Sequence, residues 1–280
     1  PAVSQTAQGN LVKVAKNKAR KAQWTYVIAP ETDAEKYSCK VIDRDLANAL
    51  ITRQRAYIED KGTLIEVRGF IGLGARAVST QWLYTLEGAN IAGMQQVLSF
   101  PVSDVLDVED EFVPTFKVVY TPNCPATGME GGQAILVDLE NYTTYIMGPD
   151  YFGESKKGAL RMLNHKVFQE GGLVLHAGAK SVQIDGNTVS MTIMGLSGTG
   201  KTTTTFSKQG DVTQPIQDDM VSLWPEGELS ITENGCFAKT FGLNEDNEPV
   251  IYRGTMSSDA WVENVYTDAQ GHFDFDKGVL

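Results

Sequence analysis

A glycine-rich segment constrains the fold of this chain more than any other stretch. It matches the pattern G-x-x-x-x-G-K-[ST] at every position, with Gly195, Leu196, Ser197, Gly198, Thr199, Gly200, Lys201 and Thr202. Residues 188–194 before it are predicted to form a strand, and residues 201–206 after it begin a helix. Backbone N–H groups in such a loop can point at phosphate oxygens, and the helix adds its positive N-terminal end. The segment therefore predicts a strand–loop–helix unit that binds phosphate.

Two side chains of this loop have the chemistry that a bound nucleotide requires. Lys201 would supply a mobile positive charge to the β- and γ-phosphates, and the Thr202 hydroxyl could ligate the Mg²⁺ of the nucleotide. The alternative is a glycine-rich turn without a ligand, which the flanking strand and helix disfavour. A phosphate loop predicts a nucleotide, and the neighbouring residues must supply the chemistry.

Length and charge exclude several other classes of protein. The 280 residues allow one or two domains with a sizeable core, and the net charge of −11 argues against nucleic-acid binding. The basic run over residues 13–21 is interpreted as a solvated helix face. No apolar stretch approaches the length of a membrane span, and no segment resembles a signal peptide. We therefore expect small-molecule ligands and neither a membrane nor a nucleic-acid partner.

The cysteines and the two ends of the chain suggest its setting. Cys39, Cys124 and Cys236 are too few and too scattered for a disulfide framework or a zinc site, which suits a reducing cytoplasm. The chain opens on Pro1 without a methionine and closes at Leu280 without a tail. We expect a cytoplasmic location and a larger parent chain, whose remainder would be a partner of this piece.

The sequence pattern predicts a mixed α/β (α+β) fold. We expect helices over residues 10–60, 79–96 and 154–169, an exposed loop over 103–114, and a hairpin turn at residues 185–187. Strands are expected over residues 64–67, 70–71, 116–120, 134–139, 143–147, 173–176, 181–184, 222–224 and 229–232. A boundary near Gly171-Gly172 would divide the chain into domains of residues 1–170 and 171–280.

Three further groups of side chains could carry chemistry, and each also has an ordinary structural interpretation. Asp218 and Asp219 could bind Mg²⁺ or Mn²⁺, or could form a solvated acidic turn. The stretch 151–157 ends in two adjacent lysines, which usually mark an exposed cationic face. His176 stands in an apolar run, where a satisfied core histidine is the more frequent case.

Together these motifs resemble phosphoenolpyruvate carboxykinase, in particular its ATP-dependent branch. The resemblance covers roughly residues 110–278 and, more faintly, 60–101, and the phosphate loop of the family is identical to residues 195–203. The other matches are Tyr-x-Gly-Glu-x-Lys-Lys at 151–157, His-x-x-Ala at 176–179, Asp-Asp at 218–219, Glu-x-Gly-Cys-aromatic-Ala-Lys at 233–239, Glu-Pro-x-Ile-Tyr at 248–252 and Glu-Asn-Val at 263–265. The resemblance implies an N-terminal substrate-side domain and a phosphate-loop domain that binds nucleotide and metal.

The resemblance also implies a reaction, from oxaloacetate and ATP to phosphoenolpyruvate, ADP and carbon dioxide. Lys157, His176 and Asp219 would ligate the catalytic Mn²⁺. Lys156 would keep its charge and stabilise the transferring phosphoryl group and the enolate oxygen. Because neighbours on a regular helix point about 100° apart, we predict that the two lysines lie at an irregular entry to the 154–169 helix.

The remaining roles concern nucleotide and substrate. Ser197, Lys201 and Thr202 would bind the ATP phosphates, with Thr203 completing the matched loop. Thr202 would also contact Mg²⁺, and Asp218 would hold the water shell of that ion. By the same resemblance, the substrate phosphoenolpyruvate or carbon dioxide would lie against Tyr151, and the nucleotide near Glu263.

Several features depart from the family. Gln217, Ala177 and Lys180 stand where glycine, cysteine and asparagine are usual, and the family's Gly-Arg-Ser-Pro-Lys stretch with its substrate arginine is absent. A nucleotide-contacting arginine of the family would follow beyond this chain. Two alternatives therefore stay open: a phosphate-loop kinase with another acceptor, and a nucleotide-sensing protein without turnover. The choice between ATP and GTP is likewise open.

Overall fold

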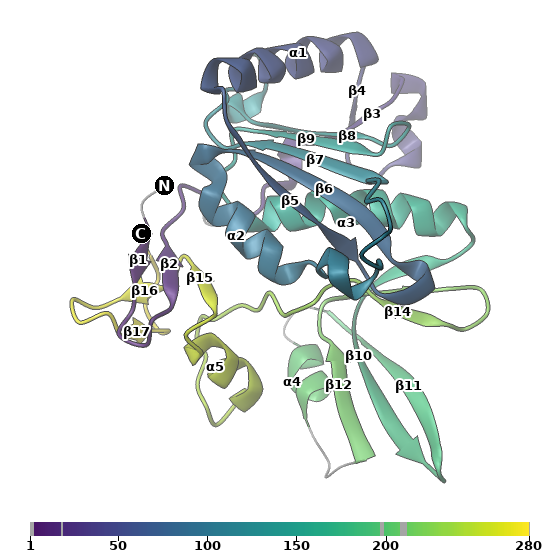
Figure 1. Ribbon diagram of the computed structural model, residues 1–280, viewed down its shortest axis with the longest axis vertical. Helices are drawn as coiled ribbons and strands as arrows, with labels where there is room; N and C mark the ends of the chain where they lie inside the picture. Colours follow the sequence, from purple (N-terminus) through teal and green to yellow (C-terminus); the bar gives the residue numbers. More distant parts are fainter. Residues whose placement is uncertain (1–2, 18, 197–198, 208–211, 280) are drawn as a thin grey trace.

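Two large β-sheets organise the residues that the computed structural model describes, which are 3–17, 19–196, 199–207 and 212–279 (Figure 1). The helices are α1 (Arg44–Lys61), α2 (Ala89–Leu98), α3 (Phe152–Gln169), α4 (Lys201–Phe206) and α5 (Pro249–Met256). The strands are β1 (Ser4–Gln5), β2 (Leu11–Lys13), β3 (Thr25–Ile28), β4 (Lys40–Ile42), β5 (Leu64–Ile71), β6 (Val78–Thr85), β7 (Phe116–Thr121), β8 (Ala134–Asp138), β9 (Thr143–Met147), β10 (Leu173–Ile184), β11 (Asn187–Met194), β12 (Thr213–Gln217), β13 (Met220–Leu223), β14 (Leu229–Ile231), β15 (Trp261–Glu263), β16 (Tyr266–Thr267) and β17 (Phe273–Asp274). The predicted mixed α/β fold is confirmed. None of the helices within these ranges is both long enough and apolar enough to cross a membrane.

The larger sheet is a mixed, seven-stranded one with helices on both faces. Its order is β4-β3-β8-β9-β7-β6-β5, and α1 lies on one face while α2 and α3 lie on the other (Figure 1). Leu50 and Leu136 are among the buried residues on the α1 side, whereas Trp82, Phe116 and Leu163 belong to the core on the α3 side. Burial on both faces makes this sheet a rigid support for α3, the helix that carries Lys156 and Lys157.

The helix predicted over residues 10–60 is correct only from residue 44 onward. Asp43 caps the start of α1 by accepting a hydrogen bond from the Asp45 N–H at 2.8 Å. Before this cap the chain forms β2, β3 and β4, of which β3 is buried along its whole length. A short strand in a sheet covered on both faces has no alternation that would distinguish it from a helix. In the basic run, Lys13 ends β2, and residues 14–17 and 19–21 form no helix, so the interpretation as a helix face is wrong for the described residues.

The helix predicted over residues 79–96 is also wrong in its first half. Residues 78–85 form β6, in which the side chains of Val78, Thr80, Trp82 and Tyr84 are buried on one face. Positions four apart share a face in both a helix and a strand, so the spacing of Trp82 and Leu86 suits either one. Only the second half of the predicted helix is present, as α2.

The second large sheet, which is built around β10, contains the strand β11 that leads into the phosphate loop. β10 is one strand of 12 residues where two strands were predicted, and it returns as β11 through a turn at Asp185 (φ 49°) and Gly186 (φ 80°). This confirms the predicted hairpin. The first part of β10, residues 173–176, pairs with β13, whereas residues 179–182 pair with β12. The strand thus changes partner close to Ala177.

A small sheet joins the two ends of the described chain. β2 lies between β1 and β15, and β15 runs parallel to β2 with Leu11 opposite Trp261. Asn264 extends this contact, because its N–H donates to the Lys13 carbonyl at 2.9 Å and its side-chain Oδ1 accepts from the Ala15 N–H at 2.8 Å. In the sequence, the strands of the seven-stranded sheet come before residue 170 and those of the β10 sheet come after it. The division into two domains at this point stays a prediction.

Candidate active site

The predicted strand–loop–helix unit is present. β11 ends at Met194 and α4 begins at Lys201, with Gly200 (φ 88°) in the left-handed conformation at the start of the helix. Ser197 and Gly198 lie outside the described residues. The Lys201 ammonium folds back over the loop and donates to the carbonyls of Gly195 at 2.8 Å and Leu196 at 3.2 Å. A lysine held by carbonyls of its own loop can move its charge to an incoming phosphate.

β10 supports the helix that follows the loop. A methyl group placed at Gly178 would lie 1.9 Å from the Thr205 Oγ1, so α4 packs directly on the strand at this glycine. Thr205 is fully buried, and its hydroxyl donates to the Lys201 carbonyl at 2.8 Å. Lys180, two residues along the strand, donates to the carbonyls of Thr204 and Ser207, both at 2.8 Å. These contacts hold both ends of α4 and therefore the loop that precedes it.

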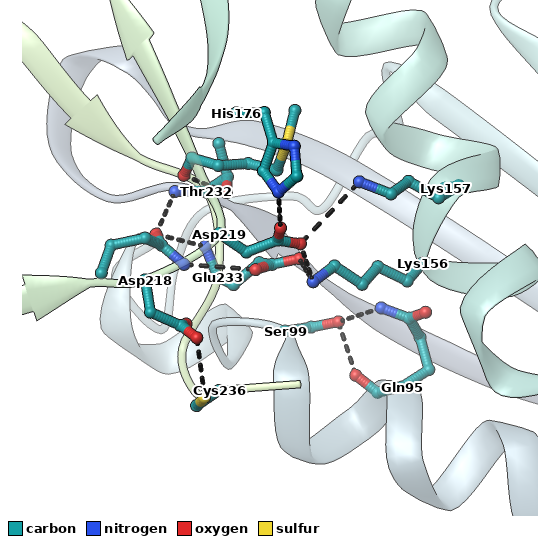
Figure 2. Close-up of polar contacts among 12 residues, drawn as sticks. Gln95, Ser99, Lys156, Lys157, His176, Asp218, Asp219, Thr232, Glu233 and Cys236 are labelled. Carbon is teal, nitrogen blue, oxygen red and sulfur yellow. Dashed lines mark hydrogen bonds and ion pairs between the residues drawn. The ribbon is translucent and has the colours of Figure 1, made fainter. Parts of the chain in front are cut away.

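A cluster of charges lies beside this unit (Figure 2). The buried Lys156 ammonium is 2.6 Å from the Asp219 Oδ2 and 2.9 Å from the Glu233 Oε1. Lys157 Nζ is 3.8 Å from the same Asp219 oxygen, and His176 Nε2 is 3.0 Å from the Asp219 Oδ1. Side chains from α3, β10 and the β12–β13 connection thus meet at one carboxylate.

The change of partner along β10 positions this carboxylate. Asp219 lies between β12 and β13, and its carbonyl accepts a hydrogen bond from the Ala177 N–H at 3.0 Å. This bond holds Asp219 next to His176, the residue that precedes Ala177. The His176 side chain is 65% exposed, so the alternative of a satisfied core histidine is wrong.

The prediction that the two lysines lie at an irregular helix entry is also wrong. α3 begins at Phe152, and Lys156 and Lys157 belong to its regular part. Both ammonium groups nevertheless reach Asp219, because a lysine carries its charge on a flexible four-carbon chain. Side-chain length thus compensates for the angle between neighbouring helix positions. Lys156 is buried and Lys157 is half-buried, so neither marks an exposed cationic face.

The cluster shifts the pKa values of Lys156 and Lys157 in opposite directions. Burial alone would lower the pKa of Lys156, but Glu233 and Asp219 together raise it above its usual value. Burial lowers the pKa of Lys157, and the positive charges of Lys156 and Arg20 add to this effect. Partial burial alone would raise the pKa of the half-buried Asp219 carboxyl, but Lys156 and Lys157 lower it below its usual value. Lys156 is therefore held charged, while Lys157 is shifted toward the neutral form.

Lys157, His176 and Asp219 suit a divalent cation. A lysine nitrogen, an imidazole nitrogen and a carboxylate oxygen are ligands that a Mn²⁺ ion accepts, provided that the lysine is neutral. The lowered pKa of Lys157 favours that form. Across the described ranges, no group of three or more His, Cys, Asp or Glu side chains could hold a metal ion. A metal site with three protein ligands at this cluster would therefore include the lysine.

The other predicted residues lie around this cluster. The Asp218 carboxylate points away from Asp219 and accepts a hydrogen bond from the Cys236 thiol at 3.1 Å (Figure 2). Tyr151 directly precedes α3, and burial raises the pKa of its hydroxyl to about 12. The Glu263 carboxylate accepts hydrogen bonds from the Phe152 N–H at 3.1 and 3.2 Å, at the start of the same helix. Thr202 is half-buried within the first turn of α4.

Two residues near the cluster were not predicted as site residues. Glu233 was only part of a matched motif, and burial raises its pKa to about 6. Arg20 was assigned to the solvated basic run, yet its positive charge adds to the lowering of the Lys157 pKa and opposes the rise in the Tyr151 pKa. The signal for Arg20 was its type, because an arginine among lysines suits a carboxylate or phosphate ligand. No sequence pattern could have identified Glu233, because its role depends on the contact with Lys156, which is distant in the sequence.

Comparisons with known proteins identify the family of this chain. A family model described as phosphoenolpyruvate carboxykinase matches residues 2–280. A protein of Mesorhizobium japonicum named phosphoenolpyruvate carboxykinase (ATP) is 34% identical over 174 residues, which are 61% of this chain and 31% of that protein. A protein of Rhizobium etli with the same name is 34% identical over 173 residues, which are 60% and 31% of the two chains.

The alignments with these relatives span only 31% of their length, and the family model matches almost the whole chain. The resemblance predicted the phosphate loop, whose flanking strand and helix are present, and it implied that Lys157, His176 and Asp219 share a metal site, which stays a prediction. The chain belongs to the phosphoenolpyruvate carboxykinase family.

Proposed function

We propose that the protein is an ATP-dependent phosphoenolpyruvate carboxykinase, which converts oxaloacetate and ATP to phosphoenolpyruvate, ADP and carbon dioxide. The observation that carries this proposal is the meeting of Lys157 and His176 at Asp219, beside the buried and charged Lys156. A protein that only senses nucleotide needs a phosphate loop and has no use for a second cluster of this kind. Relatives named phosphoenolpyruvate carboxykinase (ATP) support the same reaction. We also propose a cytoplasmic location, which suits the three free cysteines.

The nucleotide would bind along the loop and α4. The phosphates would lie over the loop, where the Lys201 charge is available, and Thr202 would face the Mg²⁺ of the nucleotide. A hollow of about 430 Å³ lies beside the helix, lined in part by Thr203, Lys239 and Glu248. This volume suits a nucleoside.

The substrate would bind on the opposite side of the cluster. Tyr151 directly precedes α3, the helix that carries both lysines, and the positive charge of Arg20 acts on the pKa of Lys157 and of Tyr151. A guanidinium pairs well with the carboxylates of oxaloacetate. Arg20 would then take the role of the arginine in the family stretch that this sequence lacks. Lys156, which is held charged, would stabilise negative charge on the enolate oxygen and on the transferring phosphoryl group.

Lys157, His176 and Asp219 would hold Mn²⁺, and Thr202 and Asp218 would serve Mg²⁺. When bound, such ions neutralise the charge of the phosphate and enolate oxygens. The residues of the chain contribute the fixed positions: α3 presents the two lysines, and β10 presents the histidine. Tyr151 and Phe237, whose rings are 6.3 Å apart, border the same region with apolar surface.

The full-length protein should form phosphoenolpyruvate from oxaloacetate only with ATP and Mn²⁺ present, measured by a coupled assay. Arg20→Met should raise the KM for oxaloacetate and leave the affinity for ATP unchanged, because in the proposed arrangement the guanidinium would contact only the acid. Tight ATP binding without phosphoenolpyruvate formation from any nucleotide would favour the sensor alternative. Transfer of phosphate to another acceptor would favour the kinase alternative.

Lys201→Ala should weaken ATP binding about tenfold in titration calorimetry, because a hydrogen bond to a charged group contributes about 1.5 kcal/mol or more. Lys239→Ala is the control for a lysine that lines the hollow but lies outside the loop, and we expect a smaller loss. An unchanged affinity in Lys201→Ala would mean that the loop does not bind the phosphates.

A further inference from the structure

Gln217 is a buried amide next to the charged cluster, in a position where the family usually has glycine. It is the last residue of β12, and its side chain is almost inaccessible to solvent. The Oε1 atom accepts hydrogen bonds from the N–H groups of Thr232 at 2.9 Å and Glu233 at 3.3 Å. The Nε2 atom donates to the Glu233 Oε2 at 3.2 Å. One side chain therefore fixes both the backbone and the carboxylate of Glu233.

The opposite oxygen of that carboxylate faces the catalytic lysine. Glu233 Oε1 lies 2.9 Å from Lys156 Nζ, and the two side chains are only 4% and 2% exposed. A buried ammonium needs a carboxylate partner, since an unpaired buried charge is strongly destabilising. Gln217 thus acts on Lys156 through Glu233.

The contacts of Asp219 show why Lys156 needs a second carboxylate as a partner. Its Oδ2 atom is the partner of Lys156 at 2.6 Å, and the same carboxylate is a proposed metal ligand. If Glu233 turned away, Lys156 would depend on Asp219 alone, and a metal ion would compete with a buried ammonium for that carboxylate. A correctly held Glu233 lets Asp219 turn to the metal while Lys156 stays paired.

We propose that Gln217 is a positioning residue that holds Glu233 as the permanent counter-ion of Lys156 and so leaves Asp219 available to a divalent cation. This inference rests on the proposed function for the existence of the metal site. A glycine at this position has no side chain that could make these three hydrogen bonds.

The chain also offers a matched control. Gln54 is an equally buried glutamine, and its Nε2 donates to the Val119 carbonyl at 3.2 Å, the Thr121 hydroxyl at 2.9 Å and the Ile146 carbonyl at 3.1 Å. These partners belong to the seven-stranded sheet, so its amide supports the fold and not the cluster. A change of Gln54 reports what the loss of a buried amide does to stability alone.

The experiment measures Mn²⁺ affinity by electron paramagnetic resonance in the full-length protein, with ATP affinity and thermal unfolding measured on the same samples. Gln217→Met keeps the length of the side chain and removes its hydrogen bonds, and we expect Mn²⁺ affinity to fall about tenfold, the lower end of the effect of residues that orient metal ligands. ATP affinity should stay within about twofold of wild type.

Gln54→Met should lower the unfolding temperature without changing Mn²⁺ affinity. Gln217→Gly, which removes the whole side chain, should reproduce the loss of Mn²⁺ affinity.

A double-mutant cycle tests the path through Glu233. In a Glu233→Gln background, Gln217→Met should change Mn²⁺ affinity by less than about twofold, because the group on which Gln217 acts is gone. A full tenfold loss in that background, or an unchanged Mn²⁺ affinity in both Gln217 variants, would overturn the inference while the metal site stands. A wild-type protein that binds no Mn²⁺ would remove the proposed metal site and the inference together.

Discussion

Lys156→Met is expected to abolish phosphoenolpyruvate formation and to lower the free energy of unfolding by about 3–5 kcal/mol. The Lys156 side chain is 2% exposed and pairs with Asp219 and Glu233. Methionine fills the same space without a charge, so the variant leaves a carboxylate that is 4% exposed, that of Glu233, without its cation. ATP affinity should stay nearly intact, because the phosphate loop is a separate unit. Urea unfolding and the coupled assay measure the two effects.

Lys157→Met is the matched control from the adjacent position. Its side chain is 28% exposed and its ammonium lies 3.8 Å from Asp219, so the expected loss of stability is below about 1 kcal/mol. Turnover should still be abolished, because this lysine is a proposed metal ligand. Equal losses of stability in the two variants, or turnover that survives in either, would contradict the different roles assigned to the two lysines.

Gly178→Val is expected to weaken ATP binding by about a hundredfold. Even a single methyl group here would lie 1.9 Å from the Thr205 Oγ1, and Thr205 cannot turn away because it is β-branched and buried and its hydroxyl is bonded to the Lys201 carbonyl. The substitution must therefore displace α4 from β10, and overpacking of this kind costs up to about 3 kcal/mol. Since Lys201 begins the helix, the phosphate loop moves with it.

Gly254→Val serves as the control for the Gly178 variant. Gly254 lies in α5, and a methyl group built there meets no atom within 4 Å, so ATP affinity should be unchanged. Calorimetry gives both affinities, and thermal unfolding shows whether each variant is folded. A folded Gly178→Val protein with wild-type ATP affinity would mean that the contact between α4 and β10 does not set the loop.

Features that depend on neighbouring residues were predicted well. The turn at Asp185-Gly186 needs two residues with positive φ, and Asp-Gly is a common choice for such a turn. The strands at 116–120, 134–139 and 143–147 are confirmed as β7, β8 and β9 to within one residue at each end. The phosphate loop and its flanking elements are equally local, because their glycines serve the turn itself.

Features that depend on distant contacts were missed or reversed. Glu233 acquires its role only because Lys156 on α3 lies 2.9 Å away, and no spacing in the sequence expresses that contact. The exposure of His176, which pairs with Met220 in the ladder between β10 and β13, is not expressed by its apolar neighbours in the sequence. The helix predicted for residues 79–85 was wrong for another reason. Apolar residues four positions apart fit both the helical and the strand period, and tertiary packing decides between the two.

The pairing of β2 with β15 has a consequence for the order in which this protein folds. The hydrogen bond from the Ala15 N–H to the Asn264 side chain joins residues that are 249 positions apart. Contacts across so long a loop form late, and during synthesis they must wait until the distant segment has left the ribosome. The seven-stranded sheet, built from residues 25–147, can assemble well before that moment. A nascent chain therefore carries a folded seven-stranded sheet before β2 has its partner β15, and before the Glu263 carboxylate reaches the Phe152 N–H at the start of α3.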